Sequence, residues 1–419
     1  MSGFGWIWLL FLSLVLLKLV MAHGLEWLNR RSLAAAAAHP EGTPAGNFTP
    51  DEIAKTVKYT EAKSVFSQIS TTYSDAVLVI FLAVGVFPWI YSTSLGALGE
   101  SAWAEAAFLF AAGILLSAAE LPLDWYSQFR LEERFGFNKT TISLWLLDML
   151  KEFLLSLILL YPLLVLVLKI VEWTGAAWWI WAWLTLTVFS LVVSILAPIF
   201  ILPLFNRFTP LPEGDLRDLL ERLARKAGIQ FRTIEVMDGS RRSTHSNAFM
   251  TGIGRFRKIA LFDTLLDQLA HEEVQAVLAH EMGHLRKKHI VKQFLFSSVK
   301  SLLGLYLVSL LLNQSWLVEP FGFQTGQLGP ALLMIGVFAS LILFWLNPLM
   351  NSLSRKYEYE ADRFAVEILE KSSPLIGALH KLHKENLSNP TPHPWYSAFY
   401  YSHPTLYERE QAMKRIRAA

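Results

Sequence analysis

Residues 278–285 read Leu-Ala-His-Glu-Met-Gly-His-Leu, a stretch that predicts an amphipathic helix with a metal-binding face. In a helix, two residues four positions apart lie on the same face, about one turn from each other. The imidazoles of His280 and His284 can therefore share one metal ion, and their spacing suits tetrahedral zinc. Glu281 follows the first histidine, where it can reach a water on that metal and act as a general base. The stretch thus indicates a hydrolytic zinc site.

A second pair of residues four positions apart can complete such a site. Residues 354–362 read Ser-Arg-Lys-Tyr-Glu-Tyr-Glu-Ala-Asp, so Glu358 and Asp362 share one face of a predicted helix. Glu358 can be the third zinc ligand, with water in the fourth position, and Asp362 can orient a ligating imidazole from behind. Glu360 lies off that face, and we expect it to be solvated. The alternative is that the whole acidic run is a solvated helix face.

The composition is that of an integral membrane protein. Of 419 residues, 53% are hydrophobic and only 17% are charged, whereas an ordinary soluble domain carries about 25% charged residues. The net charge of +2 gives no electrostatic case for binding nucleic acid. The chain has no cysteine, which excludes a disulfide framework and a thiolate metal site. Any zinc must therefore be held by histidines and carboxylates.

Seven apolar stretches approach or exceed the roughly 20 residues that cross about 30 Å of hydrocarbon. They are residues 3–22, 75–95, 103–123, 152–171, 176–204, 294–312 and 328–350. Lysine and arginine occur in the segments after the first and third stretches, and neither occurs in the segments on the opposite side. By the positive-inside rule, the N-terminus is outside and the C-terminus is cytosolic.

This topology divides the chain into four parts. Residues 1–205 hold the first five membrane helices and residues 290–350 hold the last two. Residues 206–289, with the histidine pair, and residues 351–419, with the third ligand, then fall on the same cytosolic side. That placement matters because both segments must meet to build one site.

The segment 206–289 reads as a small α+β unit. Its pattern predicts a helix over 215–228, a strand over 231–237 and a hairpin formed by 246–253 and 258–262. A further helix is expected from residue 263 to the histidine pair. Asn247, Ala248 and Phe249 lie on the outer strand of the hairpin, where an extended peptide could add through main-chain hydrogen bonds. The alternative is an ordinary hairpin strand with polar residues facing outward.

The sequence resembles the type I CAAX prenyl endopeptidase family, which are integral-membrane zinc proteases of the gluzincin kind. The resemblance covers nearly the whole chain. It rests on the seven apolar stretches, His280-Glu281-x-x-His284 followed by His289, Glu358-x-x-x-Asp362, Tyr401-Ser402-His403-Pro404, and the segments 132–138, 246–249 and 261–264. His289 fits the ligand face poorly, and we do not expect it to bind the metal. The compact chain looks more like bacterial members of the family.

The resemblance implies a hollow barrel of seven helices around a chamber, with a single zinc ion at its cytosolic end. A water-filled chamber would accommodate charged residues within the apolar stretches, such as Lys300, although Lys18 and Lys169 could instead reach the interface from helix ends. The expected location is the inner membrane of a bacterium or the endoplasmic reticulum membrane of a eukaryote. The expected partners are the lipid bilayer and a peptide or protein substrate that is prenylated or otherwise membrane-associated.

The resemblance also implies roles for residues outside the helical pairs. The tail histidine of the family stabilises the oxyanion of the reaction, and His403 occupies its position. Arg409, six residues further on, is a supporting candidate at the substrate. In gluzincins a segment similar to Asn247-Ala248-Phe249 aligns the peptide.

Three other functions are open from the sequence. A quality-control protease of the heat-shock type would share the zinc site, but four membrane helices are expected there. A transporter or receptor with an accidental histidine pair belongs to another class, and the pairing of Glu358 with Asp362 argues against it, as does the missing inverted repeat. A pseudoprotease is disfavoured because all the core catalytic residue types are present.

Overall fold

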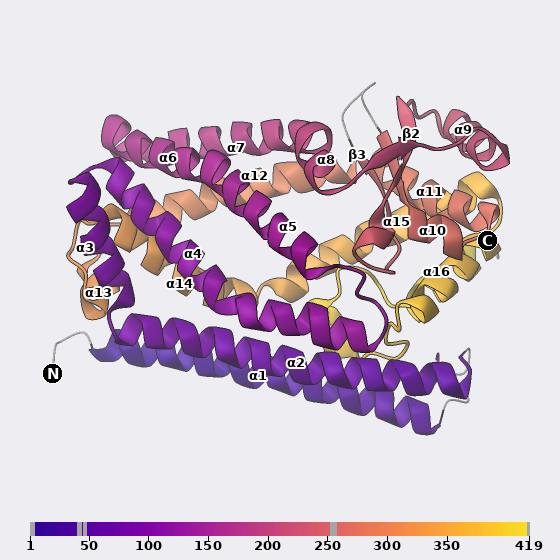
Figure 1. The fold of residues 1–419 in the computed structure, drawn as a ribbon, viewed down its shortest axis with the longest axis horizontal. Coiled ribbons are helices and arrows are strands. Elements are labelled where there is room, and N and C mark those ends of the chain that lie inside the picture. The colour runs from indigo at the N-terminus through magenta and orange to yellow at the C-terminus, as the bar shows by residue number, and fades with distance from the viewer. Residues whose placement is uncertain (1–4, 40–43, 45–47, 252–257, 417–419) are drawn as a thin grey trace.

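The structure is a computed structural model that describes residues 5–39, 44, 48–251 and 258–416. Two long antiparallel helices, α1 (Gly5–Ala38) and α2 (Pro50–Ala83), run side by side along one edge of the molecule (Figure 1). A salt bridge of 2.6 Å joins Lys18 on α1 to Asp75 on α2. Lys18 therefore has a carboxylate partner within its apolar stretch, which reduces the cost of placing a charge there.

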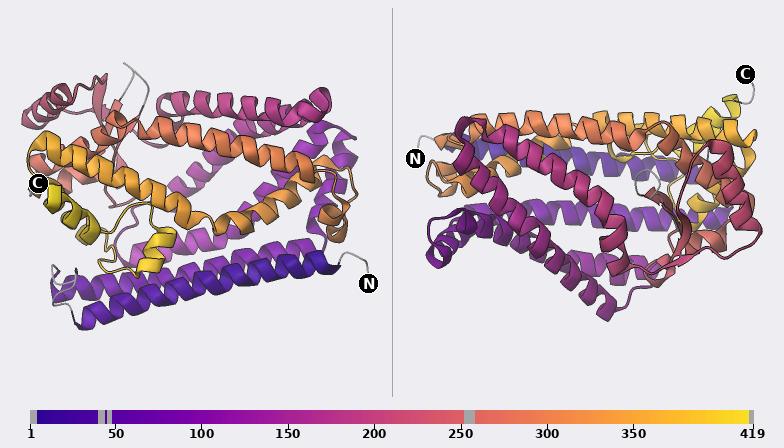
Figure 2. Two further views of the ribbon diagram at one scale, coloured as in Figure 1. Left: turned by 180° about the vertical axis from the view of Figure 1, so that it is seen from behind. Right: turned by 90° about the horizontal axis from the view of Figure 1, so that it is seen from above.

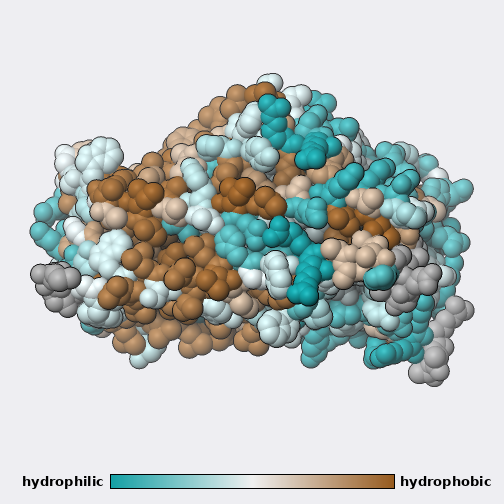
Figure 3. Space-filling model, turned by 90° about the horizontal axis from the view of Figure 1, so that it is seen from below, coloured by the Kyte–Doolittle hydropathy of each residue, from teal (hydrophilic) through white to brown (hydrophobic). Residues whose placement is uncertain are grey.

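Together with α1 and α2, a further set of helices makes up the apolar half of the molecule (Figures 1 and 2). They are α3 (Val86–Leu98), α4 (Ala102–Tyr126) continued by π-helix η2 (Ser127–Glu132), α5 (Ile142–Leu155), η3 (Ser156–Leu160), α6 (Tyr161–Thr174), η4 (Gly175–Ala177), α7 (Trp178–Leu196), η5 (Ala197–Ile201), α8 (Leu202–Phe205), α12 (His289–Leu311), α13 (Ser315–Val318), η8 (Glu319–Phe321) and α14 (Leu328–Phe344). Figure 3 shows hydrophobic side chains over this half and hydrophilic ones over the other.

Within the described residues, five helices are long and apolar enough to cross a membrane, or six if the bent pair of α14 and α15 (Asn347–Leu369) forms one span. One of the five is the run Ile142–Phe205 of 64 residues, which would be roughly 96 Å long if it were straight. It turns back at Gly175, whose φ of 55° favours glycine, so that α6 and α7 pack against each other. The multi-pass membrane fold is confirmed, whereas the count of seven and the chamber stay predictions.

The cytosolic unit predicted over 206–289 contains a four-stranded sheet of order β1-β2-β4-β3. The strands are β1 (Phe208–Pro210), β2 (Thr233–Met237), β3 (Ala248–Thr251) and β4 (Lys258–Phe262). The β2–β4 pair is parallel and the other two pairs are antiparallel. The expected strand and hairpin are therefore confirmed, and the tip of the hairpin lies outside the described residues.

The single helix expected from residue 263 to the histidine pair is wrong. Two helices occur, α10 (Asp263–Gln268) and α11 (His271–Arg286), because Leu269 and Ala270 adopt extended backbone conformations between them. The Glu273 carboxylate accepts a hydrogen bond of 2.8 Å from the Ala270 N–H, which caps the start of the second helix.

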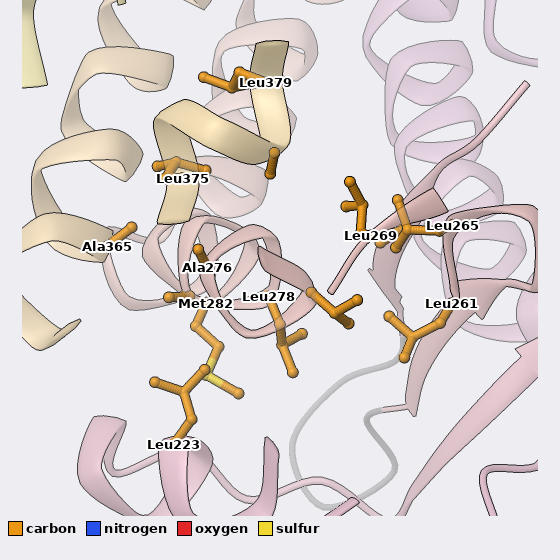
Figure 4. Close-up of a cluster of buried hydrophobic side chains, with 14 of the residues drawn as sticks. Leu223, Leu261, Leu265, Leu269, Ala276, Leu278, Met282, Ala365, Leu375 and Leu379 are labelled. Atoms are coloured by element: carbon orange, nitrogen blue, oxygen red, sulfur yellow. The ribbon is translucent and has the colours of Figure 1, made fainter. Parts of the chain in front are cut away.

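Helix α11 lies at the centre of the hydrophobic core of the unit that carries the sheet (Figure 4). Around it lie α9 (Asp215–Ala227), α15 (Asn347–Leu369) and α16 (Ser373–Glu385), and the chain ends in α17 (Pro394–Tyr400) and α18 (Leu406–Ile416). Leu278 and Met282 on α11 are fully buried in the same cluster as Leu223 of α9 and Leu375 of α16. The apolar face of α11 is thus fixed in the core, and its other face carries the polar pattern.

Candidate metal centre

Helices α11 and α15 touch at backbone distance. A Cβ added at Gly283 would lie 2.8 Å from the Cα of Ala361 and 3.0 Å from its carbonyl oxygen. Any side chain at this position would separate the helices, which explains the glycine inside the histidine pentad. The close approach brings Glu358 and Asp362 on α15 against the polar face of α11.

Three side chains from these helices converge on one point. The Nε2 atom of His284 lies 3.2 Å from Nε2 of His280 and 3.2 Å from Oε1 of Glu358. The distance from His280 Nε2 to Glu358 Oε2 is 3.3 Å. Ligands about 2.0–2.1 Å from a tetrahedral zinc ion are separated by roughly 3.3 Å, so this set fits zinc.

The buried carboxylate of Glu358 also suits a metal. Its Oε2 atom is buried and has no hydrogen-bond partner in the described part of the chain. Burial alone would raise the pKa of Glu358, but the imidazoles of His280 and His284 hold that pKa well below its usual range. The group is therefore anionic at neutral pH, as a zinc ligand must be.

On one side of the centre, a buried ion pair supports His280. Its Nδ1 atom lies 2.8 Å from Oδ1 of Asp362. The guanidinium of Arg409 donates to both oxygens of Asp362, over 2.9 and 2.6 Å. Burial lowers the pKa of His280, but the nearby carboxylates of Asp362 and Glu358 outweigh burial and raise that pKa to about 9.

On the other side, a second imidazole supports His284. Nδ1 of His284 lies 3.0 Å from Nδ1 of His289, whose Nε2 lies 3.0 Å from Oε2 of Glu360. The ring of His289 is 1% exposed and stacks on Tyr357 at 4.3 Å. Glu360 was expected to be solvated, but its side chain is only 31% exposed and has this partner.

Sequence patterns missed this arrangement because it depends on a backbone reversal. Lys288 has a φ of 58°, a left-handed conformation that ends α11 and redirects the chain into α12. The turn brings His289 back beside His284, although a continuous helix would place the two rings on different faces. The expectation that His289 is not itself a ligand agrees with this geometry.

Glu281 has the environment expected of a general base. Its carboxylate is half-buried and forms no hydrogen bond or ion pair with the residues that the structure describes. Burial raises the pKa of Glu281, although the neighbouring His280 and His284 act against that shift. A carboxylate with a raised pKa is a better proton acceptor near neutral pH.

The tail brings His403 to the same place. Its Nε2 atom lies 3.5 Å from Oε1 of Glu358, and 63% of its side chain is exposed. Arg355, one turn before Glu358 on α15, donates to the carbonyl of Tyr401 over 2.9 Å and to that of Ala398 over 3.3 Å. One helix therefore carries Glu358 and Asp362 and also holds the segment before His403. Arg355 was not predicted, because nothing in its local pattern distinguishes it from a surface arginine.

Ala248 and Phe249 lie on β3, which packs alongside α11, whereas Asn247 precedes this strand and is not on it as expected. Among the described strands, β3 forms one edge of the sheet and pairs only with β4, with Ala248 opposite Leu261. Asn247 is exposed and Ala248 is buried. An edge next to the metal centre is thus present, and its use by a substrate stays a prediction.

These features define a class: an integral-membrane zinc metallopeptidase. Two family models match consecutive parts of the chain. Residues 29–207 match the model for the CAAX prenyl protease N-terminal region with five membrane helices, and residues 210–417 match peptidase family M48. The chain belongs to peptidase family M48, and it is a zinc metalloendopeptidase of the membrane that acts on peptide or protein substrates.

Similar proteins cover most of the chain. CAAX prenyl protease 1 of Saccharomyces cerevisiae is 37% identical over 394 residues, which span 86% of this chain and 85% of the relative. The human homologue is 32% identical and covers 85% of this chain and 84% of its own. The crystal structure of S. mikatae Ste24p superposes with a TM-score of 0.91 at 31% identity, covering 97% of this chain and 98% of that one. These relatives are eukaryotic, and a bacterial source stays a prediction.

Proposed function

We propose that this protein removes C-terminal tripeptides from prenylated proteins. The observation that carries the proposal is the likeness to proteins called CAAX prenyl protease 1, which spans the membrane helices as well as the metal centre. A shared zinc site alone would support only peptide hydrolysis, because many folds carry one. The shared membrane part is what favours a lipid-modified substrate.

In this proposal His280, His284 and Glu358 hold one zinc ion. The bound zinc supplies an activated water and polarises the scissile carbonyl. Asp362 accepts a hydrogen bond from His280 Nδ1 and fixes the orientation of that ring, and Arg409 fixes Asp362 in turn. This positioning role replaces the substrate contact that the sequence suggested for Arg409, because its guanidinium is buried against Asp362.

One residue, Glu281, transfers the proton in both steps of the reaction. Glu281 accepts a proton from the attacking water and later delivers it to the amine that leaves as the peptide bond breaks. His403 donates a hydrogen bond from Nε2 to the oxyanion that develops on the attacked carbonyl. The segment Asn247-Ala248-Phe249 pairs with the extended peptide through the open edge of β3.

The proposed orientation places the metal centre in the cytosol and the N-terminus on the opposite side. The distribution of lysine and arginine supports it, and the first turns of α1 and helix α18 lie at opposite ends of the molecule (Figure 1). In a eukaryotic cell the corresponding membrane is the endoplasmic reticulum, and in a bacterium it is the inner membrane.

Product analysis by mass spectrometry tests the substrate. A farnesylated peptide ending in a CAAX sequence and its unmodified twin are incubated with the purified protein, with Glu281→Gln as the inactive control. We expect release of an intact tripeptide from the farnesylated peptide and slower cleavage of the twin. Cleavage of the twin as fast, or at scattered bonds, would contradict the proposal and favour a quality-control protease.

A further inference from the structure

A cavity of about 730 Å³ opens between α2 and the junction of α4 with η2. Its lining shares no residue with the candidate metal centre. The rings of Phe66 on α2 and Tyr126 on α4 stack across it at 5.7 Å and 19°, which joins the two helices. The cavity is therefore a separate feature of the fold, and the proposed function gives it no role.

The cavity changes from basic to apolar along its length. Lys58 lies near the start of α2, and Val65 and Ile69 follow two and three turns later in the direction of the apolar stretch. Val65 and Ile69 are 44% and 56% exposed, so no described helix or strand covers them. From Lys58 to Ile69 the helix rises about 16 Å. This is the shape that an amphiphile with a charged end requires.

The opposite wall has the same polarity. Leu123 lies in the apolar helix α4, and Arg130 and Arg134 follow towards the loop that the positive-inside rule places in the cytosol. Leu131 is buried against Tyr59, which fixes the π-helix η2 that carries Arg130. A π-helical turn shifts the faces of a helix, and such turns recur at functional sites.

The cations of the cavity have no partner of opposite charge among the residues that the structure describes. Within the described residues, Lys58, Arg130 and Arg134 form no ion pair, and neither arginine forms a hydrogen bond through its guanidinium. Arg130 lies over the ring of Trp125 at 5.4 Å, and Arg134 lies over the ring of Phe135 at 5.6 Å. Glu61 is the one acidic residue among the described residues of the lining, so the cavity has excess positive charge.

We propose that this cavity binds one anionic phospholipid from the cytosolic leaflet. Its phosphate lies between Lys58, Arg130 and Arg134, and an acyl chain follows Val65 and Ile69. Basic pockets between membrane helices attract anionic headgroups, and the surrounding aromatic rings are typical of the interface between membrane and water. A free phosphate ion would use the basic end alone and would leave the apolar wall exposed.

Native mass spectrometry of the full-length protein tests this assignment. Protein is released from nanodiscs of phosphatidylcholine mixed with phosphatidylserine, and the retained lipids are counted. We expect one phosphatidylserine per wild-type chain in preference to phosphatidylcholine. In the double variant Arg130→Gln/Arg134→Gln we expect that preference to fall at least about tenfold, because each cation near the surface adds to the attraction.

The matched control is Arg222→Gln/Arg232→Gln, which removes two exposed arginines of the cytosolic unit and should keep the preference. Zinc content checks the fold of both variants. Inorganic phosphate, added as a competitor, should not displace the lipid. Equal retention of phosphatidylserine by the first double variant and the wild type would overturn the proposal. Displacement by phosphate, or equal retention of phosphatidylcholine, would also overturn it.

Discussion

The two sides of the metal centre support their histidines in different ways. On one side His280 bonds directly to Asp362, whose two oxygens are held by the buried guanidinium of Arg409. On the other side His284 reaches its carboxylate, Glu360, only through the ring of His289. We call the first the direct side and the second the relayed side. Asp362 on the direct side is 1% exposed, whereas the side chain of Glu360 on the relayed side is 31% exposed.

This difference in burial predicts which substitutions weaken zinc binding most. Removing one partner of a buried ion pair leaves an uncompensated charge in a medium of low dielectric, which is costly. A carboxylate at the surface can be replaced by water, because the polar partner keeps a hydrogen bond. We therefore expect unequal losses when the two sides are altered.

The largest effect should follow at the residue where both sides meet. Glu358→Ala removes the carboxylate that faces both imidazoles, over 3.2 and 3.3 Å. Two histidines alone leave a tetrahedral zinc short of protein ligands. We expect purified protein to lose its zinc, measured by elemental mass spectrometry. Unchanged metal content would remove Glu358 from the ligand set.

Asp362→Asn alters the direct side, because Asp362 accepts hydrogen bonds from both His280 and Arg409. The amide accepts a weaker hydrogen bond from His280 and removes the nearer of the two carboxylates beside Arg409, so zinc affinity should fall about 100-fold. Competition with a chelator measures the affinity. The control is Glu367→Gln, an exposed carboxylate on the same helix, which should behave as wild type.

The pH dependence of zinc binding also tests the direct side, because His280 must lose a proton before it binds zinc. In the metal-free protein the pKa of His280 is raised to about 9, so below that pH a proton must leave before zinc binds. As the pH falls from 9 to 7, this group should lower the apparent affinity by about tenfold per unit. Asp362→Asn should flatten the slope, because it weakens a bond that raises the pKa. An equal slope in the variant would mean that Asp362 does not set it.

The smallest effect should come from the relayed side. Glu360→Gln keeps a hydrogen-bond acceptor for Nε2 of His289 at a position open to water, so zinc affinity should fall by about tenfold or less. The same chelator competition applies. A loss of zinc affinity as large as that of Asp362→Asn would show that the two sides are equivalent and would contradict the expected order.

Much of the direct side could be predicted from the sequence. The spacing of His280 and His284, and of Glu358 and Asp362, follows from helix periodicity, because each pair is four residues apart. The contact between the two helices needed the glycine at 283, whose importance depends on Ala361 opposite it. The apolar stretches likewise indicated a multi-pass membrane protein.

The relayed side could not be predicted, and the reason is local. The left-handed Lys288 redirects the chain, and no residue pattern announces that conformation at a lysine. Arg409 could be placed near the centre because it lies six residues after His403, but its pairing with Asp362 depends on how α18 packs on α15. The break between α10 and α11 is a similar case, where backbone geometry overrides a continuous pattern.

In the proposed mechanism, Glu281 moves the proton in a zinc-dependent hydrolysis. The direct measurement is Glu281→Gln, with zinc content and peptide cleavage determined on the same sample. The glutamine keeps the shape of the side chain and leaves all three ligands in place, but it accepts no proton at neutral pH. We predict about one zinc ion per chain and a loss of cleavage of at least about 100-fold. Full cleavage by this variant would contradict the mechanism.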